Sequence, residues 1–278
     1  MTMSLHQNFA KDNLRLLAYQ ALIEIEPLSK KALVEYIVSC VIREQFFIQD
    51  PSIHKIQESL IPGRPPEPQL VNPLSVKKRS MNTNEGRAIA IHALAHIEFN
   101  AVNLALDAVW RFSNMPEQYY LDWIKVAGEE AKHFFMLKNH LNSLGYDYGN
   151  FPAHDSLWEM VEKTKGDILA RMALVPRTME ARGLDAVPLI RARFLQAKDA
   201  EMVEILDVIL RDEIGHVEIG NRWFNFLCKE REVDPIIIFN SLSQQYNAPH
   251  LRGPFNIEAR KQAGFTDAEI DFLQDNYS

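Results

Sequence analysis

The chain has 278 residues, 47% of them hydrophobic, and a formal net charge of -7 at pH 7. It is long enough to bury a sizeable core, and its acidic balance gives no global reason to bind nucleic acid, although a local basic patch would not show in that sum. Two cysteines, Cys40 and Cys228, exclude a disulfide framework and a cysteine metal cluster, and the lack of a long uncharged apolar run predicts a cytoplasmic protein without a membrane span.

The N-terminal part divides into a helical segment and a proline-rich segment. Residues 13–47 show mixed apolar spacing with a break at Pro27, which predicts two helices. Residues 61–84 contain five prolines, too many for a helix or a central strand, so we expect an extended arm lying across the rest of the protein. The predicted parts are an N-terminal helical appendage (1–60), a proline-rich arm (61–83), a four-helix bundle (84–231) and a tail with short helices (232–278).

The first core helix is predicted over residues 85–112, where apolar side chains recur at three- and four-residue spacing. Glu98 lies on this apolar stripe and is therefore predicted to point inward. His92 and His96 could form a second metal site or a proton path. Because residues two apart on a helix point about 200° apart, His96 faces away from Glu98, and we expect it to contact a neighbouring helix or the arm instead.

Two copies of one short pattern follow along the chain. Glu130 precedes His133, and Glu213 precedes His216, by three residues each. Residues three apart lie roughly 60° apart around a helix and ~4.5 Å apart along it, so each pair can reach one inward point. A single pair of this kind is common on solvated helices. Two pairs, each joined by a helix that gives one further Glu, make the di-iron or di-manganese site of ferritin-like bundles.

A helical stretch over about 155–182 lies between the two pairs and carries Glu180 on an apolar face. We predict a break at residues 183–188, a short helix over 189–196 and the fourth core helix from about Asp199. The core helices then carry, in chain order, a single acid, a pair, a single acid and a pair. The six predicted metal ligands are Glu98, Glu130, His133, Glu180, Glu213 and His216.

Each pair is preceded by another acid, Glu129 before Glu130 and Asp212 before Glu213. A ligating imidazole usually donates its second ring proton to such a carboxylate. We expect Glu129 and Asp212 to do this crosswise, each reaching the histidine of the facing helix, because its own helix turns it away from its own histidine. Four carboxylates and two imidazoles in one core are costly unless cations neutralise them.

Capping boxes are predicted at two further helix starts. Ser156 with Glu159 fits the start of the third core helix, and Thr266 with Glu269 fits the start of a small terminal helix.

Several runs of the chain together resemble a ferritin-like family known only as a domain of unknown function. The resemblance covers nearly the whole chain, and it implies the fold and the di-metal site without any departure at the six ligand positions. It implies no activity, although its more distant similarity is to non-haem di-iron hydroxylases, including the enzyme that hydroxylates a modified adenosine of tRNA. The runs that carry it are residues 93–98, 129–133, 151–155, 173–177, 180–183 and 211–216, extended by 254–256, 258–260 and 263–265.

Nitrogen and oxygen ligands suit divalent iron or manganese. We expect two metal ions, with iron as the first choice and manganese or a mixed pair as alternatives, and dioxygen as co-substrate. The leading hypothesis is an oxygen-dependent oxidoreductase or hydroxylase acting on an unidentified small organic substrate, served by an electron donor protein. The sequence leaves monomer and homodimer open.

Three other interpretations stay open. A ferroxidase or iron-handling protein would turn over ferrous ion without an organic substrate, and a scaffold would use its metals only to brace the fold. A tRNA-modifying hydroxylase requires a positive rim, for which the chain offers one local cluster, and its binding would weaken as salt rises. That cluster consists of Arg64, Lys77, Lys78 and Arg79.

Overall fold

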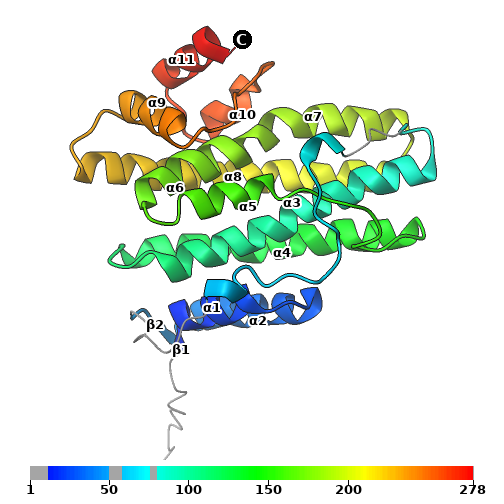
Figure 1. The fold of residues 1–278 in the computed structure, drawn as a ribbon, viewed down its shortest axis with the longest axis horizontal. Coiled ribbons are helices and arrows are strands. Elements are labelled where there is room, and N and C mark those ends of the chain that lie inside the picture. Colours follow the sequence, from blue (N-terminus) through cyan, green and yellow to red (C-terminus); the bar gives the residue numbers. More distant parts are fainter. Residues whose placement is uncertain (1–11, 50–57, 76–79, 278) are drawn as a thin grey trace, which may run out of the picture. The chain divides into compact units, whose positions relative to one another are not determined.

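The computed structural model describes residues 12–49, 58–75 and 80–277, and these form an all-α bundle, as the sequence predicted. Two short strands, β1 (Asp12–Asn13) and β2 (Phe46–Phe47), pair in parallel. The backbone clusters into two compact units, which are described in turn: Met1–Pro65 with Ala101–Ala131, and Pro66–Asn100 with Lys132–Ser278. Figure 1 labels the elements in chain order.

The first unit contains the two predicted N-terminal helices, α1 (Leu14–Ile23) and α2 (Pro27–Ile42). Pro27 is the first residue of α2, where its missing N–H costs nothing. Lys30 of α2 is buried, and its ammonium donates to the carbonyl oxygens of Ala21 (2.8 Å) and Leu22 (3.1 Å) and to Asn103 Oδ1 (2.7 Å). The lysine thereby satisfies the last carbonyls of α1.

A short 3₁₀ turn, η1 (Glu58–Leu60), precedes the proline-rich segment, and the described part of the segment contains no regular element except a second such turn, η2 (Pro73–Ser75). Its first part runs directly against the end of α1: a Cβ added to Gly63 would lie 2.3 Å from the Ile23 carbonyl carbon. Only glycine permits so close an approach.

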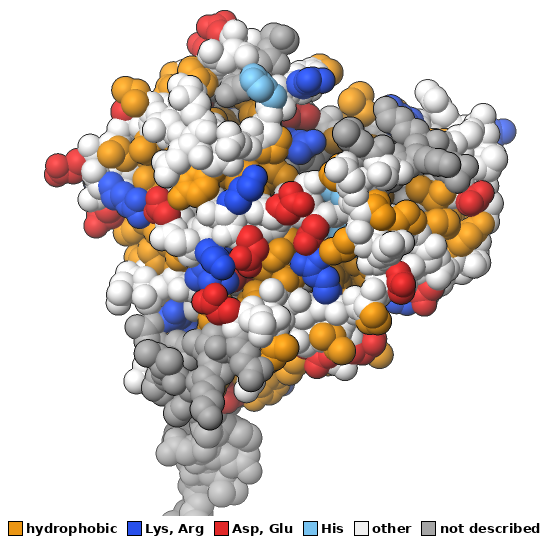
Figure 2. Space-filling model, in the orientation of Figure 1, with side chains coloured by type: hydrophobic (Ala, Val, Ile, Leu, Met, Phe, Trp, Pro, Cys, Tyr) orange, Lys and Arg blue, Asp and Glu red, His pale blue; other side chains and the backbone are white. Residues whose placement is uncertain are grey.

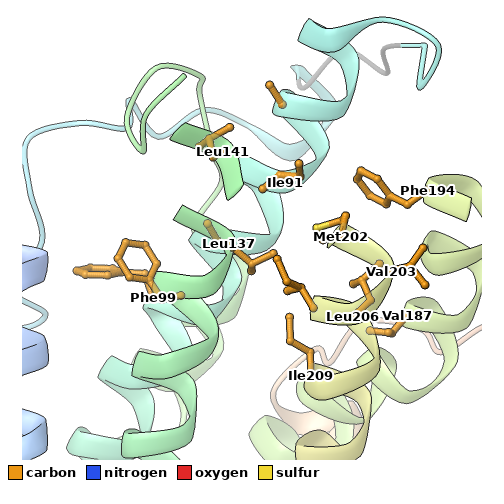
Figure 3. Packing of buried hydrophobic residues seen from close by; sticks show 14 residues of the cluster. Ile91, Phe99, Leu137, Leu141, Val187, Phe194, Met202, Val203, Leu206 and Ile209 are labelled. Carbon is orange, nitrogen blue, oxygen red and sulfur yellow. The ribbon is translucent and has the colours of Figure 1, made fainter. Parts of the chain in front are cut away.

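Four helices of the second unit contribute to one apolar core: the first part of α3 (Asn84–Arg111), the last part of α4 (Glu117–Ser143), α7 (Ala181–Gln196) and α8 (Ala200–Glu230). Helices α7 and α8 run side by side (Figure 1). Figure 3 shows Ile91, Leu137, Met202 and Leu206 in the space between the helices, and Phe99 apart from them on the left. The labelled members are Ile91, Phe99, Leu137, Leu141, Val187, Phe194, Met202, Val203, Leu206 and Ile209.

The third core helix differs from the prediction of one helix followed by a break at residues 183–188. It is divided earlier, into α5 (Ser156–Lys163) and α6 (Ile168–Leu174), and α6 continues through a π-helix, η3 (Val175–Glu180), into α7. The early break is stabilised by Asp167, which accepts the Leu169 amide and so caps α6.

Pro188 lies inside α7 and does not end the helix, so the break predicted there was wrong. A proline in a helix leaves the carbonyl four residues earlier without its usual donor. Here that carbonyl belongs to Leu184, and Asn256 Nδ2 donates to it at 3.2 Å. A side chain 72 residues away thus replaces the lost hydrogen bond.

Three shorter helices complete the second unit: α9 (Pro235–Gln245), α10 (Ile257–Gln262) and α11 (Asp267–Tyr277). The capping box predicted before α11 is confirmed, because the Thr266 amide donates to Glu269 Oε2 at 2.9 Å and the Glu269 amide donates to Thr266 Oγ1 at 3.3 Å. The box predicted at Ser156 was wrong: Ser156 is the first residue of α5, and the cap position is taken by Asp155.

Helix α3 is long and apolar enough to cross a membrane by length and composition. However, 72% of its most apolar window is buried inside the protein, where it carries Glu98, Asn103 and Asp107 as buried polar residues. These features are those of a core helix, so α3 gives no clear membrane span. The cytoplasmic location stays a prediction.

Acidic and basic side chains alternate with hydrophobic ones on the face drawn in Figure 2. Of the predicted basic cluster, Arg64 is described, whereas Lys77, Lys78 and Arg79 lie outside the described residues. A positive rim for tRNA stays a prediction.

Candidate metal centre

The centre begins with one acid and one histidine on two core helices. Glu98 of α3 is 4% exposed and His133 of α4 is fully buried. Their side chains meet, with His133 Nδ1 3.5 Å from Glu98 Oε2. Glu130 lies one turn before His133 on the same helix and is also fully buried. The inward direction predicted for these three residues is therefore observed.

Helix α8 contributes a second acid and a second histidine. Glu213 is 7% exposed and His216 is fully buried, and Glu213 Oε1 lies 3.7 Å from His216 Nδ1. The rings of His133 and His216 have their centroids 5.9 Å apart. The histidines of the two repeated patterns thus lie close together, although 83 residues separate them in the sequence (216 − 133 = 83).

Four of these residues form a compact group. Glu98, Glu130, His133 and Glu213 each offer one ligand atom, and these atoms all lie within 4.8 Å of one another. Three buried carboxylates so close together repel one another when they are charged, and a cation between them would relieve that repulsion. Carboxylate oxygens with an imidazole nitrogen are the donor set that iron and manganese prefer. The group could hold a metal ion.

Two of the six predicted ligands, His216 and Glu180, are not members of this group. Glu180 is the last residue of the π-helix η3 and is 8% exposed. The π-helix packs tightly against α8: a Cβ added to Gly220 would lie 2.4 Å from Pro176 Cβ. Single π-turns are frequent at functional sites, since they re-aim side chains within a helix. The roles of Glu180 and His216 as ligands stay predictions.

Asp212 makes the crosswise contact expected from the sequence. Its Oδ2 atom on α8 lies 3.0 Å from His133 Nε2 on α4. A carboxylate accepts, so Nε2 donates and the other ring nitrogen, Nδ1, faces Glu98 as a possible metal ligand. Glu129, in contrast, lies 3.9 Å from Lys125 of its own helix, and its contact with His216 stays a prediction.

Two basic residues flank Asp212 on its outer side. Arg211 Nη2 lies 2.8 Å from Asp212 Oδ1, and Lys132 Nζ lies 3.8 Å from Asp212 Oδ2. Burial raises the pKa of Asp212, but hydrogen bonds from His133 and Arg211 outweigh it and hold that pKa below its usual range. Asp212 is therefore an anion at neutral pH, which favours a proton on His133 Nε2. No sequence pattern indicated the contact of Arg211, because that contact depends on the side-chain direction of Asp212.

His92 and His96 contact the loop after α4 and form no second metal site with the groups described. The Gly149 amide donates to His92 Nε2 at 2.9 Å, and burial lowers the pKa of His92 to about 4. His96 Nδ1 lies 2.8 Å from the Tyr148 hydroxyl, and its Nε2 lies 3.0 Å from Asn100 Nδ2. The contact of Tyr148 with His96 was not predicted from local spacing, since 52 residues separate the two.

Comparisons with known proteins place the chain in a family. A family model described as "Protein of unknown function (DUF455)" matches residues 24–271. An uncharacterized protein of Haemophilus influenzae is 48% identical over 225 residues, which cover 78% of each chain. No solved structure matches the chain. The family match spans far more than half of the sequence, and the chain therefore belongs to the DUF455 family of proteins of unknown function.

Proposed function

We propose that this protein is a di-metal carboxylate protein of the ferritin-like type, which binds two iron ions and catalyses the oxygen-dependent oxidation of a small organic substrate. The observation that carries the proposal is the buried group of Glu98, Glu130, His133 and Glu213, whose ligand atoms lie within 4.8 Å of one another. A fold that gathers three carboxylates in its core needs a source of positive charge there.

The arrangement of acids and histidines supports two ions rather than one. Glu98 approaches His133 (3.5 Å), and Glu213 approaches His216 (3.7 Å), so each half of the centre has one carboxylate and one imidazole. Glu130 belongs to the same compact group and would add a third carboxylate to the donor set. Two Glu-x-x-His patterns with additional carboxylates are the donor set of di-iron bundles, and Glu180 would complete it.

The chain's own residues would orient and shield such a centre. Asp212 holds His133 through Nε2, and this hydrogen bond fixes the ring so that Nδ1 faces the acids. The apolar core beside the centre, including Phe99 and Phe134, excludes water and strengthens the interactions inside. When bound, two ferrous ions would supply electrons for the reduction of dioxygen. The proposal places the protein in the cytoplasm and includes an electron donor protein that supplies its reducing equivalents.

The decisive measurement is the amount of iron and manganese per chain after anaerobic loading with ferrous ion. We expect about two ions for the native protein, as in other bundles with this donor set, and a loss of metal in the Glu213→Ala, His216→Ala double variant. The matched control is Glu204→Ala, which removes an exposed carboxylate from the same helix. A well-folded native protein that binds little or no metal would overturn the proposal.

Oxygen consumption by the iron-loaded protein then separates the enzymatic hypotheses. An oxygenase consumes oxygen in proportion to an organic substrate and a reductant. A ferroxidase consumes it in proportion to added ferrous ion alone. Absence of both activities in a protein that holds two ions would favour the hypothesis of a scaffold whose metals only brace the fold.

A further inference from the structure

Two buried arginines lie far from the sequence motifs that define the metal centre. Arg177 of the π-helix is 3% exposed, and Arg260 of α10 is 1% exposed. Both guanidinium groups lie near one aromatic ring, because their central carbons are 4.9 Å (Arg177) and 5.3 Å (Arg260) from the centre of Phe265. Two positive charges therefore share one apolar environment. We call these residues the arginine pair.

Each arginine has one carboxylate partner within the protein. Arg177 Nη2 donates to Glu269 Oε1 at 2.7 Å. Arg260 donates to both carboxylate oxygens of Asp185, from Nη2 at 2.7 Å and from Nε at 3.2 Å. These ion pairs balance the charges, but they do not use all the donors, because a guanidinium has five N–H groups.

Three nitrogen atoms of the arginine pair are buried without a hydrogen-bond acceptor: Arg177 Nε, Arg177 Nη1 and Arg260 Nη1. Native proteins seldom leave buried charged donors unsatisfied, so an acceptor that is not part of the chain is expected here. Aromatic faces do surround the guanidinium of Arg177, which lies 4.3 Å from the ring centre of Phe224 and 5.2 Å from that of Phe239. Such contacts favour a cation but do not replace acceptors.

A small cavity borders both arginines. Its volume is about 20 Å³, and its other walls are Glu269, which is paired with Arg177, and apolar residues that include Phe239, Phe265 and Leu273. A volume of roughly 10–15 Å³ on this measure holds one water, so the cavity has room for little more than one water-sized group, such as a halide ion or the end of one carboxylate. It shares Phe239 and Leu251 with a larger hollow of about 360 Å³ lined largely by polar residues.

From the unsatisfied donors, the shared cavity and its apolar walls, we propose that the arginine pair binds one small monovalent anion, either a halide ion or the carboxylate group of a small acid. Several guanidinium N–H groups and a low-dielectric wall favour an anion over water, since charge-assisted hydrogen bonds are the stronger ones. The cavity is too small for phosphate or sulfate with its four oxygens.

The test is thermal unfolding of the full-length protein at constant ionic strength, with gluconate as the bulky reference anion. Sodium chloride or sodium acetate is then exchanged for gluconate. We expect a saturable rise of the unfolding temperature with one of the two salts. A response to chloride identifies a halide site, and a response to acetate identifies a carboxylate site. No response to either salt overturns the proposal.

Variants assign the effect to the arginine pair. In Arg177→Lys and Arg260→Lys the charge stays but N–H donors are lost, and we expect the apparent anion affinity to fall about tenfold or more. Arg191→Gln is the control, because Arg191 forms an ion pair with Asp207 at the surface. Loss of the response in the control, or its retention in both lysine variants, contradicts the assignment.

A crystal of the native protein grown in sodium bromide gives an answer even if the variants fail to fold. Anomalous scattering from bromide beside Arg177 Nη1 and Arg260 Nη1 supports a halide site, and carboxylate-shaped density after an acetate soak supports the other source. A water molecule only, in both crystals, overturns the proposal. None of these measurements depends on the metal centre.

Discussion

The three acids of the candidate metal centre and the two arginines of the arginine pair are all buried charged residues, but their charges are balanced in different ways. The chain supplies each arginine with a carboxylate, Glu269 for Arg177 and Asp185 for Arg260. Among the contacts described for the three acids, the neighbours are imidazoles, His133 for Glu98 and His216 for Glu213, which carry charge only when protonated.

This difference predicts which property of each site, stability or ligand binding, changes when one of its charged residues is replaced. Where the fold supplies both charges, removal of one partner leaves the other buried and destabilises the protein. Where one sign of charge accumulates, the fold depends on a bound ion, and removal of one charge changes ligand binding instead. Loss of Glu269 or Asp185 should therefore lower the stability of the protein, and loss of a carboxylate from the metal centre should lower its metal affinity.

The largest expected effect comes from Glu269→Gln, which gives the arginine pair a charge imbalance like that of the metal centre. Glutamine keeps the capping box with Thr266 but loses the charge opposite Arg177. We expect the free energy of unfolding to fall by about 3–5 kcal/mol, the usual cost of breaking a buried ion pair. Urea unfolding measures it, with Glu258→Gln on the exposed side of α10 as control.

The pH dependence of stability gives a second test of the ion pair between Glu269 and Arg177. Burial raises the pKa of Glu269, but Arg177 and Thr266 outweigh it and hold that pKa below its ordinary value of 4.5. The stabilisation is therefore complete above about pH 4.5 and is lost as pH falls through the folded-state pKa. We expect this loss in the native protein and its absence in Glu269→Gln; equal acid sensitivity of the two proteins would contradict it.

The next largest effect is expected from Glu98→Gln, which removes one carboxylate from the metal centre. With ferrous ion at a hundredfold excess over its Kd, the native protein should gain about 2.7 kcal/mol of stability, and the variant much less. Without metal the variant should be the more stable protein, by roughly 1 kcal/mol, because one of three crowded acids is neutral. Unfolding curves measured with metal and with chelator test both expectations, the smaller gain in stability with metal and the higher stability of the variant without it. A metal-free variant less stable than the native protein would contradict the repulsion.

A smaller effect is expected from Asp212→Asn, which removes the acceptor that holds His133. We expect about a 10–100-fold loss of metal affinity, as for other carboxylates that support a ligating histidine. Isothermal titration with ferrous ion under anaerobic conditions measures it. Asp207→Asn on the exposed face of the same helix is the control. Unchanged affinity would mean that Asp212 does not orient the ring.

The smallest expected effect separates packing from charge. In Gly220→Ala the new Cβ would lie 2.4 Å from Pro176 Cβ, and the π-helix that carries Glu180 and Arg177 must shift. We expect a loss of about 1–3 kcal/mol, typical of overpacking. Gly215→Ala is the matched control on α8, because nothing lies within 4 Å of its added Cβ. That variant should be neutral or up to about 1 kcal/mol more stable. Equal unfolding temperatures for the two variants would contradict the tight contact.

Sequence periodicity predicted the core helices well where one apolar stripe ran without interruption, as on α3 with Glu98. It failed around Pro188, because the rule that proline ends a helix assumes that the freed carbonyl stays without a donor. Asn256 supplies that donor from another part of the chain. The arginine pair was not predicted either, since Arg177 and Glu269 are 92 residues apart and each alone is an ordinary charged residue.

The sequence by itself determined the all-α class and the repeated acid and histidine pairs, because helix geometry fixes the direction of residues three and four apart. Only the tertiary structure decided which of these donors meet: it brought Glu98, Glu130, His133 and Glu213 together and directed Asp212 to a histidine 79 residues away. Contacts between separate helices depend on how their surfaces pack, and local spacing carries no information about that packing.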